Sequence, residues 1–387
     1  MPLKILAVDD EPDLELLMRQ NFRRKIRAGE YNFFFAHNGY EALDLLKENP
    51  DVDIIFSDIN MPEMDGLTLL KNVIEKHPTV KSVIISAYGD MKNLRTAMNN
   101  GAFDFVTKPI DFSDLEITLN KTILEVEARR EAAKSKDQLM SLQKEMQIGR
   151  TIQESFLPDS IPQKDGWEIS ALFTPAKEVA GDFYDAFTLD NGRYIAFVVA
   201  DVCGKGLGAA LFMTLIRSLI RAFSMENTGE LKAPASSIHS AHNYVVQNHE
   251  AANMFATVFF GVIDSESSTL KYSSCGHNTT YVVNNGVIKH SLDPNNPLVG
   301  LFPHDEFAMG EVQLEPGDII FAFTDGVTDI LNPLNESYTG ERVEQDLAEN
   351  FPSAKEMLAV FEKKLFDFKQ DAAQFDDITM MAIKKVL

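Results

Sequence analysis

Apolar residues in the first third of the chain gather in five short runs, each followed by a stretch in which they recur every three or four positions. The runs predict buried strands at residues 5–8, 31–36, 54–57, 82–86 and 103–106. The intervening stretches, such as the one with Leu14, Met18 and Phe22, have the period of an amphipathic helix. This alternation predicts an α/β domain with a doubly wound, five-stranded parallel sheet. Functional groups of such sheets lie at the carboxyl ends of the strands.

Residues 111–157 contain no proline and almost no glycine, and their apolar residues keep a helical period. One stripe consists of Leu115, Leu119, Thr122 and Val126, and a second, imperfect stripe consists of Leu139, Leu142, Met146, Gly149 and Phe156. We expect one long helix, or two joined helices, with coiled-coil character, ended by Pro158 and Pro162. Such a helix would connect two domains and hold two copies of the chain together as a homodimer.

From about residue 165 the pattern changes to strand-like runs joined by turns rich in Gly, Asn and Asp. The runs predict strands at residues 194–200, 255–263, 270–274, 280–283, 319–324 and 378–383. Helical periods predict helices at residues 208–223, 235–248, 342–350 and 354–366. Because strands and helices are segregated, we expect an α+β sandwich of antiparallel sheets flanked by helices.

The length and composition fit two domains. A chain of 387 residues, 45% of them hydrophobic, can bury two cores and still supply a connector. We therefore predict domains at residues 1–122 and 161–387, joined by a helical linker at residues 123–160. The two cysteines, Cys203 and Cys275, lack zinc-type spacing and are expected to stay reduced.

The charge narrows the choice of partners. A formal net charge of −22 is repelled by phosphate backbones and by anionic membranes. Nucleic acid and membranes are therefore poor candidate partners, and a DNA-binding output is disfavoured. No uninterrupted apolar window predicts a transmembrane helix, and the first residues do not have the pattern of a secretory signal. We expect a cytoplasmic protein.

Five polar residues stand at the ends of the first set of strands. Asp9 and Asp10 follow the first strand, Asp58 ends the third, Ser86 ends the fourth and Lys108 follows the fifth. Carboxylates brought together at one sheet edge repel one another and need a cation, for which a hard divalent ion is suited. An aspartate there can attack a phosphoryl group, while a metal and a lysine offset the charge on its oxygens.

The motifs around these residues resemble the receiver family of response regulators. They are Val8-Asp9-Asp10-Glu11, Asp58-Ile59-Asn60-Met61-Pro62-Glu63-Met64-Asp65-Gly66, Ser86-Ala87 and Phe105-Val106-Thr107-Lys108-Pro109. The resemblance implies that Asp58 accepts a phosphoryl group from a sensor histidine kinase. It also implies that Asp9, Asp10, Asp58 and the Asn60 carbonyl hold Mg²⁺. Ser86, Phe105 and Lys108 would form the switch, with Phe105 standing where tyrosine is more usual.

Acidic motifs recur in the second half, each where an apolar strand meets a turn. They are Gly181-Asp182-Phe183-Tyr184-Asp185, Ala200-Asp201-Val202-Cys203-Gly204-Lys205-Gly206, Thr324-Asp325-Gly326-Val327-Thr328-Asp329 and Phe375-Asp376-Asp377-Ile378-Thr379. Without His or Cys at ligand spacing, zinc is disfavoured, and Mg²⁺ or Mn²⁺ is favoured. Several carboxylates can hold two such ions, which activate a bridging water and clamp phosphoryl oxygens.

This half resembles PPM-type phosphatases of the SpoIIE/RsbU branch, which act on phosphoserine in small antagonists of anti-sigma factors. Further supporting motifs are Phe255-Ala256-Thr257-Val258-Phe259-Phe260-Gly261-Val262-Ile263-Asp264, Cys275-Gly276-His277-Asn278, Pro297-Leu298-Val299-Gly300-Leu301 and Ile152-Gln153-Glu154-Ser155-Phe156-Leu157-Pro158. The resemblance implies two Mn²⁺ or Mg²⁺ ions and a phosphorylated anti-anti-sigma factor as substrate. The implied metal ligands are Asp182, Asp201, the Val202 carbonyl, Asp325 and Asp376, with Asp377 and Gly204 in secondary positions. The phosphate-binding arginine of eukaryotic relatives has no evident counterpart.

Two residues near these motifs leave alternatives open. His277 is either a general acid or, as is more common for a histidine beside glycine at a strand end, a structural residue. Lys205 either contacts a substrate phosphate or is an exposed loop lysine. Phenylalanines such as Phe183 and Phe259 are expected in the core.

The leading hypothesis is an enzyme, a metal-dependent protein serine phosphatase gated by phosphorylation of Asp58. The alternative is a receiver-controlled adaptor that sequesters a regulatory protein without turnover. A domain without activity would be expected to lack some of the four aspartates, and all are present. We expect residues 148–156 to pack on the second domain and to set whether its metal loops are competent. The direction of this control does not follow from the sequence.

Overall fold

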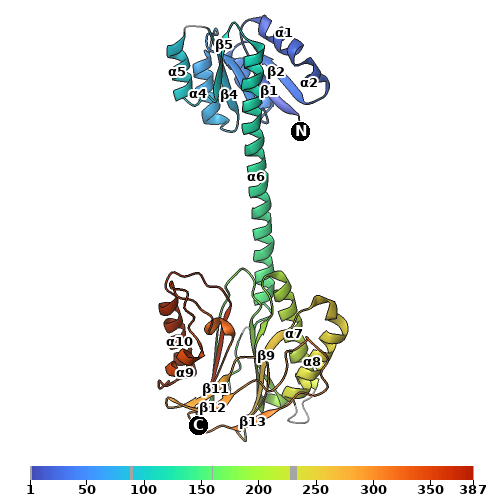
Figure 1. Cartoon of the computed structure of the whole chain (residues 1–387), viewed down its shortest axis with the longest axis vertical. Coiled ribbons are helices and arrows are strands. Elements are labelled where there is room, and N and C mark those ends of the chain that lie inside the picture. Colours follow the sequence, from blue (N-terminus) through green and yellow to red (C-terminus); the bar gives the residue numbers. More distant parts are fainter. Residues whose placement is uncertain (1, 88–89, 159, 227–232, 387) are drawn as a thin grey trace. The chain divides into compact units, whose positions relative to one another are not determined.

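The structure is a computed structural model that describes residues 2–87, 90–158, 160–226 and 233–386. The chain divides into two compact units, Met1–Met140 and Ser141–Leu387. One helix, α6 (Phe112–Glu154), begins in the first unit and ends in the second (Figure 1).

The N-terminal unit has the predicted doubly wound fold. Its strands are β1 (Leu3–Val8), β2 (Tyr31–Ala36), β3 (Ile54–Asp58), β4 (Lys81–Ala87) and β5 (Asp104–Lys108). They form one parallel sheet in the order β2-β1-β3-β4-β5. The helices before α6 are α1 (Pro12–Asn21), α2 (Arg23–Arg27), α3 (Gly39–Glu48), α4 (Gly66–Lys76) and α5 (Met91–Asn99). Separate apolar clusters form on the two faces of the sheet, so β3 is buried on both sides.

The first part of α6 belongs to the N-terminal core. Leu115, Leu119 and Val126 are buried in the cluster that also contains α1. Farther along, the guanidinium of Arg130 lies 2.5 Å from a carboxylate oxygen of Asp53, at the amino end of β3. Of the two alternatives predicted for the linker, the structure has the single helix. It ends at Glu154, before Pro158 is reached.

The C-terminal unit consists of two five-stranded antiparallel sheets packed face to face. One sheet has the order β13-β10-β9-β8-β7, and the other has the order β12-β11-β14-β15-β6. The strands are β6 (Trp167–Thr174), β7 (Phe183–Leu189), β8 (Tyr194–Val202), β9 (Ala256–Asp264), β10 (Thr269–Cys275), β11 (Thr280–Asn284), β12 (Val287–Leu292), β13 (Gly310–Gln313), β14 (Ile319–Phe323) and β15 (Ile378–Lys385). Of these, β6, β7, β12 and β13 are strands that the hydrophobic pattern did not predict.

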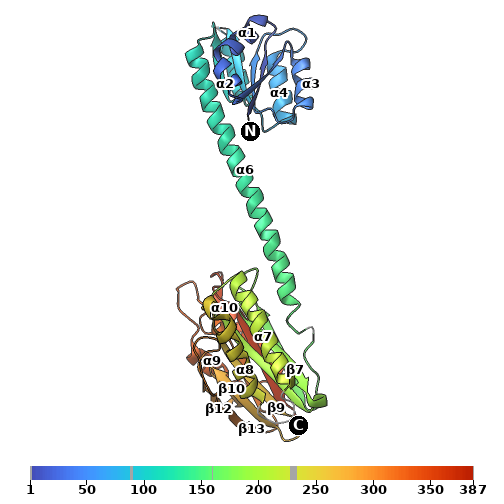
Figure 2. The same cartoon turned by 90° about the vertical axis from the view of Figure 1, so that its right-hand side faces the viewer.

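Helices cover both outer faces of this sandwich (Figures 1 and 2). On one side lie α7 (Leu207–Glu226) and α8 (Ala233–His249), and on the other lie α9 (Gly340–Asp346) and α10 (Ala354–Lys369). A third apolar cluster fills the space between the sheets. The unit therefore has four layers, as an α+β sandwich requires.

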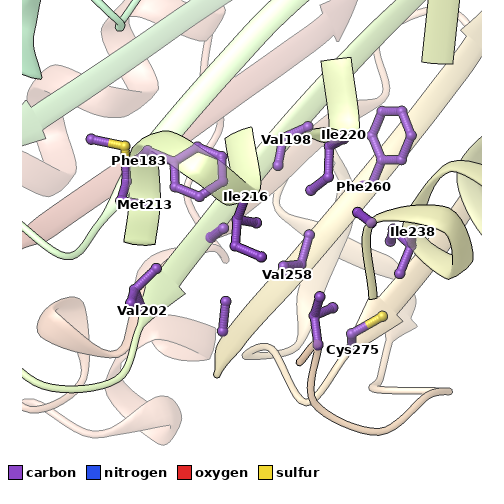
Figure 3. Packing of buried hydrophobic residues seen from close by; sticks show 14 of the residues in the cluster. Phe183, Val198, Val202, Met213, Ile216, Ile220, Ile238, Val258, Phe260 and Cys275 are labelled. Atoms are coloured by element: carbon purple, nitrogen blue, oxygen red, sulfur yellow. The ribbon is translucent and has the colours of Figure 1, made fainter. Parts of the chain in front are cut away.

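The helix α7 is unusually apolar for a surface helix. Among the described residues, its segment Leu207–Met225 alone is long and apolar enough to cross a membrane. Met213, Ile216 and Ile220 from this helix nevertheless pack against Val198 and Val258 in the core (Figure 3). Packing on the sheet accounts for one face of α7, while Leu207, Leu211 and Met225 are exposed.

Candidate functional site

Three carboxylates meet at the carboxyl edge of the N-terminal sheet. Asp9 follows β1, and Asp58 is the last residue of the neighbouring strand β3. One ligand oxygen from each of Asp9, Asp10 and Asp58 lies within 4.8 Å of the other two. An all-oxygen set at this spacing fits a hard divalent cation such as Mg²⁺. The backbone N–H of Asn60 lies 3.4 Å from Asp58 Oδ1, which puts that residue beside the same cluster.

A lysine completes this cluster from a third strand. Lys108 Nζ, at the end of β5, lies 2.6 Å from Asp58 Oδ2 and 2.9 Å from Asp9 Oδ2. Burial lowers the pKa of Lys108, but its hydrogen bonds to Asp58 and Asp9 outweigh burial and raise the pKa to about 12. Lys108 is therefore a permanent cation at neutral pH. A Cβ on Gly66 would lie only 2.0 Å from the Asp58 carbonyl oxygen, so glycine is required there.

The other two predicted switch residues lie next to each other. The Ser86 hydroxyl is buried and has no hydrogen-bond partner among the described residues, so it can donate to an acceptor placed on Asp58. Phe105, on the adjacent strand, is 37% exposed. Both residues line one cavity of about 350 Å³, together with Met91 and Leu94 of α5. The phosphoacceptor edge and the outer face of β5 are thus joined through this cavity.

The four predicted aspartates of the C-terminal unit all stand at strand ends. Asp182 precedes β7, Asp201 is near the end of β8, Asp325 follows β14, and Asp376 precedes β15. Asp182 forms hydrogen bonds across the two sheets. Its Oδ2 accepts from the hydroxyls of Thr324, which follows β14, and Thr379, in β15. Thr324 Oγ1 is 2.6 Å away and Thr379 Oγ1 is 2.7 Å away.

These carboxylates act on one another electrostatically. Burial, followed by the charge of Asp325, raises the pKa of Asp201 to about 7. Burial and the charge of Asp201 raise the pKa of Asp182 well above its ordinary value. Burial and the charge of Asp376 raise the pKa of Asp325. A set of oxygen ligands held together against this repulsion fits divalent cations, which would relieve it.

The two carboxylate sites differ in compactness. Within the part of the chain that the structure describes, only the N-terminal site has three carboxylates with ligand oxygens within 4.8 Å of one another. The C-terminal carboxylates are more widely spaced.

The secondary residues hold the loop that carries Asp182. Asp377 Oδ1 accepts the N–H of Ala176 at 2.7 Å, and its Oδ2 accepts the N–H of Gly181 at 2.9 Å. Both oxygens of Asp377 therefore bind backbone. A Cβ on Gly181 would lie 2.8 Å from the Val202 carbonyl oxygen, so glycine lets the Asp182 loop approach that carbonyl. Gly204 has a positive φ of 87°, which forms the turn after Asp201.

The structure shows what the two ambiguous residues contact. Lys205 Nζ lies 2.8 Å from Asp376 Oδ2 and 2.7 Å from the Phe375 carbonyl, so it pairs with a predicted ligand. His277 is fully buried, with Nδ1 3.0 Å from Thr257 Oγ1. Burial lowers the pKa of His277 to about 3, which leaves the ring neutral at physiological pH. A structural role for His277 is favoured over that of a general acid.

Sequence reasoning missed the two threonines that bind Asp182. Thr324 and Thr379 stand inside the quoted acidic motifs, directly before Asp325 and directly after Ile378. A hydroxyl residue beside each acidic turn was the available signal. Its target could not be seen, since Asp182 is 142 and 197 positions away.

Comparisons with known proteins identify the families of the two domains. A family model described as stage II sporulation protein E (SpoIIE) matches residues 191–386, and a model described as response regulator receiver domain matches residues 5–120. Protein IcfG of Synechocystis sp. is 38% identical over 261 residues, which are 62% of this chain and 41% of IcfG. Phosphoserine phosphatase RsbU of Bacillus subtilis is 27% identical over 63% of this chain and 71% of its own length. The SiaA-PP2C domain of Pseudomonas aeruginosa superposes with a TM-score of 0.55 at 21% identity, over 64% of this chain and 98% of that domain.

Proposed function

Because the chain belongs to the stage II sporulation protein E family and carries a receiver domain, we propose that it is a two-component response regulator with a metal-dependent protein serine/threonine phosphatase as its output. The observation that carries this proposal is that Asp182, Asp201 and Asp325 stand at strand ends of both sheets, where burial and neighbouring carboxylates raise their pKa values. Carboxylates gathered at such an electrostatic cost are typical of a site built around cations. The receiver would occupy residues 1–122, the linker 123–160 and the phosphatase 161–387.

In the phosphatase, Asp182, Asp201, Asp325, Asp376 and the Val202 carbonyl would hold two Mg²⁺ or Mn²⁺ ions. When bound, such ions supply an activated hydroxide and offset the charge on the phosphoryl oxygens. Thr324 and Thr379 fix one oxygen of Asp182, so that its carboxylate keeps one orientation. Asp377 and Gly204 shape the surrounding loops.

In the receiver, Asp58 would accept the phosphoryl group from a sensor histidine kinase. Asp9, Asp10, Asp58 and the Asn60 carbonyl would hold Mg²⁺, which offsets the charge of the incoming phosphoryl group. Lys108 is already within hydrogen-bond distance of Asp58 and can move its contact to a phosphoryl oxygen. The unpartnered Ser86 hydroxyl can donate to another, and Phe105 would respond to that movement.

We propose a phosphorylated anti-anti-sigma factor as the substrate, in a partner-switching pathway in the cytoplasm. The support is the relative RsbU, whose name describes a phosphoserine phosphatase. We also propose that the chain forms a homodimer through α6. Exposed Leu139 and Leu142, one turn apart on that helix, would pack against a second copy.

The catalytic proposal is tested by Mn²⁺-dependent hydrolysis of a chromogenic aryl phosphate. Asp201→Asn should lower the rate at least about 100-fold, since removing a group that merely supports a ligand already costs up to about that factor. Asp371→Asn, at an exposed position near Asp376, is the matched control and should retain full activity. Equal activity of the wild type and Asp201→Asn would refute the metal site. Inactive wild type that still binds Mn²⁺ would favour the adaptor.

The regulatory proposal is tested with a small-molecule phosphodonor. The wild type should gain one phosphoryl group by mass and change its phosphatase rate. Asp58→Asn should do neither, because an amide is not a nucleophile for this transfer. A phosphodonor response that survives in Asp58→Asn would contradict the assignment of Asp58.

A further inference from the structure

In the last turn of α6, the side chain of Gln153 forms hydrogen bonds with the backbone of the phosphatase domain. Gln153 is only 6% exposed, although it lies on a helix whose neighbouring residues face solvent. Its Oε1 accepts the N–H of Ala180 at 2.9 Å, and its Nε2 donates to the Ala180 carbonyl at 2.7 Å. A single amide thus satisfies both backbone polar groups of a buried residue. Without Gln153, both groups would be buried and unpaired.

Ala180, which Gln153 binds, is two positions before the proposed metal ligand Asp182. Gly181 follows Ala180 and donates its N–H to Asp377, and Asp182 comes next. The position of a Cβ on Gly181 would be 3.6 Å from Asp201 Oδ1, so this short segment touches a second proposed ligand. The Asp182 loop is therefore held from two sides, by Asp377 at the start of β15 and by Gln153 at the end of α6.

The turn of α6 before Gln153 lies against the same part of the domain. A Cβ on Gly149, one turn earlier in α6, would lie 3.7 Å from Val179 and 3.9 Å from Leu207, which is ordinary van der Waals contact. Hydrogen bonds weaken steeply with distance and angle, so a small rotation or shift of this turn would release Ala180.

We propose that Gln153 is a positioning residue that holds the Asp182 loop in its metal-binding arrangement, and that α6 controls the phosphatase through this contact. The proposal rests on the proposed function in taking Asp182 as a metal ligand and the receiver as the domain that controls the phosphatase. Nearer its other end, α6 packs on the receiver through buried Val126 and forms the Arg130–Asp53 ion pair. The receiver contacts and Gln153 thus belong to the same helix, Phe112–Glu154, and a shift of this helix is the change that would release Ala180.

The test compares Gln153→Met with Gln147→Met in the full chain. Methionine keeps the length of glutamine and removes both hydrogen bonds. Gln147 is the matched control, being an exposed glutamine on the same helix. Binding of Mn²⁺ is measured by calorimetry, and the Mn²⁺ midpoint of aryl phosphate hydrolysis is measured separately. The receiver is identical in all variants, so its own metal binding contributes equally to each titration.

Gln153→Met should raise the Mn²⁺ concentration for half-maximal binding and activation about 10-fold, as expected for loss of a group that orients a ligand. The KM for the aryl phosphate at saturating Mn²⁺ should stay unchanged, and the phosphodonor should no longer alter the rate. Gln147→Met should behave as the wild type. Midpoints and a phosphodonor response equal in both variants would overturn the proposal.

A second variant covers the case in which Gln153→Met does not fold. Gln153→Glu keeps the size and the acceptor for the Ala180 N–H but cannot donate to the Ala180 carbonyl. It should raise the Mn²⁺ midpoint in the same direction, and an unchanged midpoint would count against the proposal. If the wild type binds Mn²⁺ but hydrolyses nothing, the proposed function fails, while the calorimetric comparison still decides the role of Gln153.

Discussion

The two carboxylate sites of this chain balance their charge in different ways. In the receiver, Lys108 lies among the carboxylates and contacts Asp58 and Asp9 directly. In the phosphatase, Lys205 pairs with Asp376, and burial with mutual repulsion raises the pKa values of Asp182 and Asp201. The receiver site is thus partly neutralised by the protein itself. The phosphatase site depends on protons or metal ions for the same purpose.

The two sites also differ in the strands and loops that supply their carboxylates. The receiver carboxylates come from neighbouring strands of one sheet, whose register fixes their spacing. The phosphatase carboxylates come from two sheets and several loops, held together by Thr324, Thr379 and Asp377. A site assembled from separate loops can be regulated by moving one of them. A site built on a single sheet edge keeps the spacing of its carboxylates fixed.

The largest expected effect concerns the stability of the metal-free phosphatase domain. The pKa of Asp201 rises from 3.8 to about 7 on folding, so between these pH values the folded state binds more protons than the unfolded state. Its contribution to the free energy of unfolding should therefore be present at pH 4 and fall, as the pH rises to about 7, by on the order of 2–4 kcal/mol. Mn²⁺ should restore stability at pH 8 and do little at pH 5.

The single tryptophan of the chain makes this measurable. Trp167 is buried in β6, so its fluorescence during urea unfolding reports the phosphatase domain alone. The quantity of interest is the difference between the wild type and Asp201→Asn at each pH. Buried His277 has the opposite pH dependence, but it is common to both proteins and cancels in that difference. A difference that stays constant from pH 4 to pH 8 would remove the basis of the comparison.

A smaller effect should appear when Lys108 is replaced. Lys108→Met should make the receiver resemble the phosphatase, because Asp9 and Asp58 lose their internal counter-charge. Without Mg²⁺ the receiver should be destabilised by about 1–2 kcal/mol, a partly buried pair being worth less than a fully buried one. Mg²⁺ should recover most of this loss.

Hydrogen exchange of peptides from the receiver measures this loss without interference from the other domain. Lys47→Met is the matched control, since Lys47 pairs with Asp44 at a position where the lysine side chain is 73% exposed. That change should cost no more than about 0.5 kcal/mol. Equal costs for the two substitutions would mean that Lys108 does not neutralise the receiver site.

The sequence predicted strands such as β2 and β14, which contain a long continuous run of apolar residues. Residues 31–36 were predicted with their observed bounds, and β14 was predicted to within a residue. In contrast, β6 is half-buried along nearly all its length and shows no alternation, and β12 is a mostly exposed edge strand. Local hydrophobicity carries no signal for such strands, because their pairing is decided by the neighbouring strand.

In the candidate site, too, the sequence predicted some residues and missed others. The aspartates were visible because each follows or precedes an apolar run. The contacts that orient them were not, since Thr379 and Gln153 act on residues 197 and 27 positions away. Spacing along the chain shows which residues reach a sheet edge. It does not show which oxygen of Asp182 a hydroxyl will fix.

The smallest expected effect separates a structural histidine from a catalytic one. Neither carboxylate site should use a titrating histidine, since His277 is neutral and bound to Thr257, whose strand partner is Asp201. His277→Asn should lower the free energy of unfolding by about 1–2 kcal/mol through its lost packing and hydrogen bond. The shape of the pH–rate profile should not change, and the rate should fall less than about 10-fold, whereas loss of a general acid costs at least about 100-fold.

His242→Asn is the matched control. His242 lies on α8, is equally buried and accepts the N–H of Gly300. Similar behaviour of the two variants would assign His277 to packing, and loss of one limb of the profile in His277→Asn alone would make it the proton donor that distinguishes the phosphatase from the receiver.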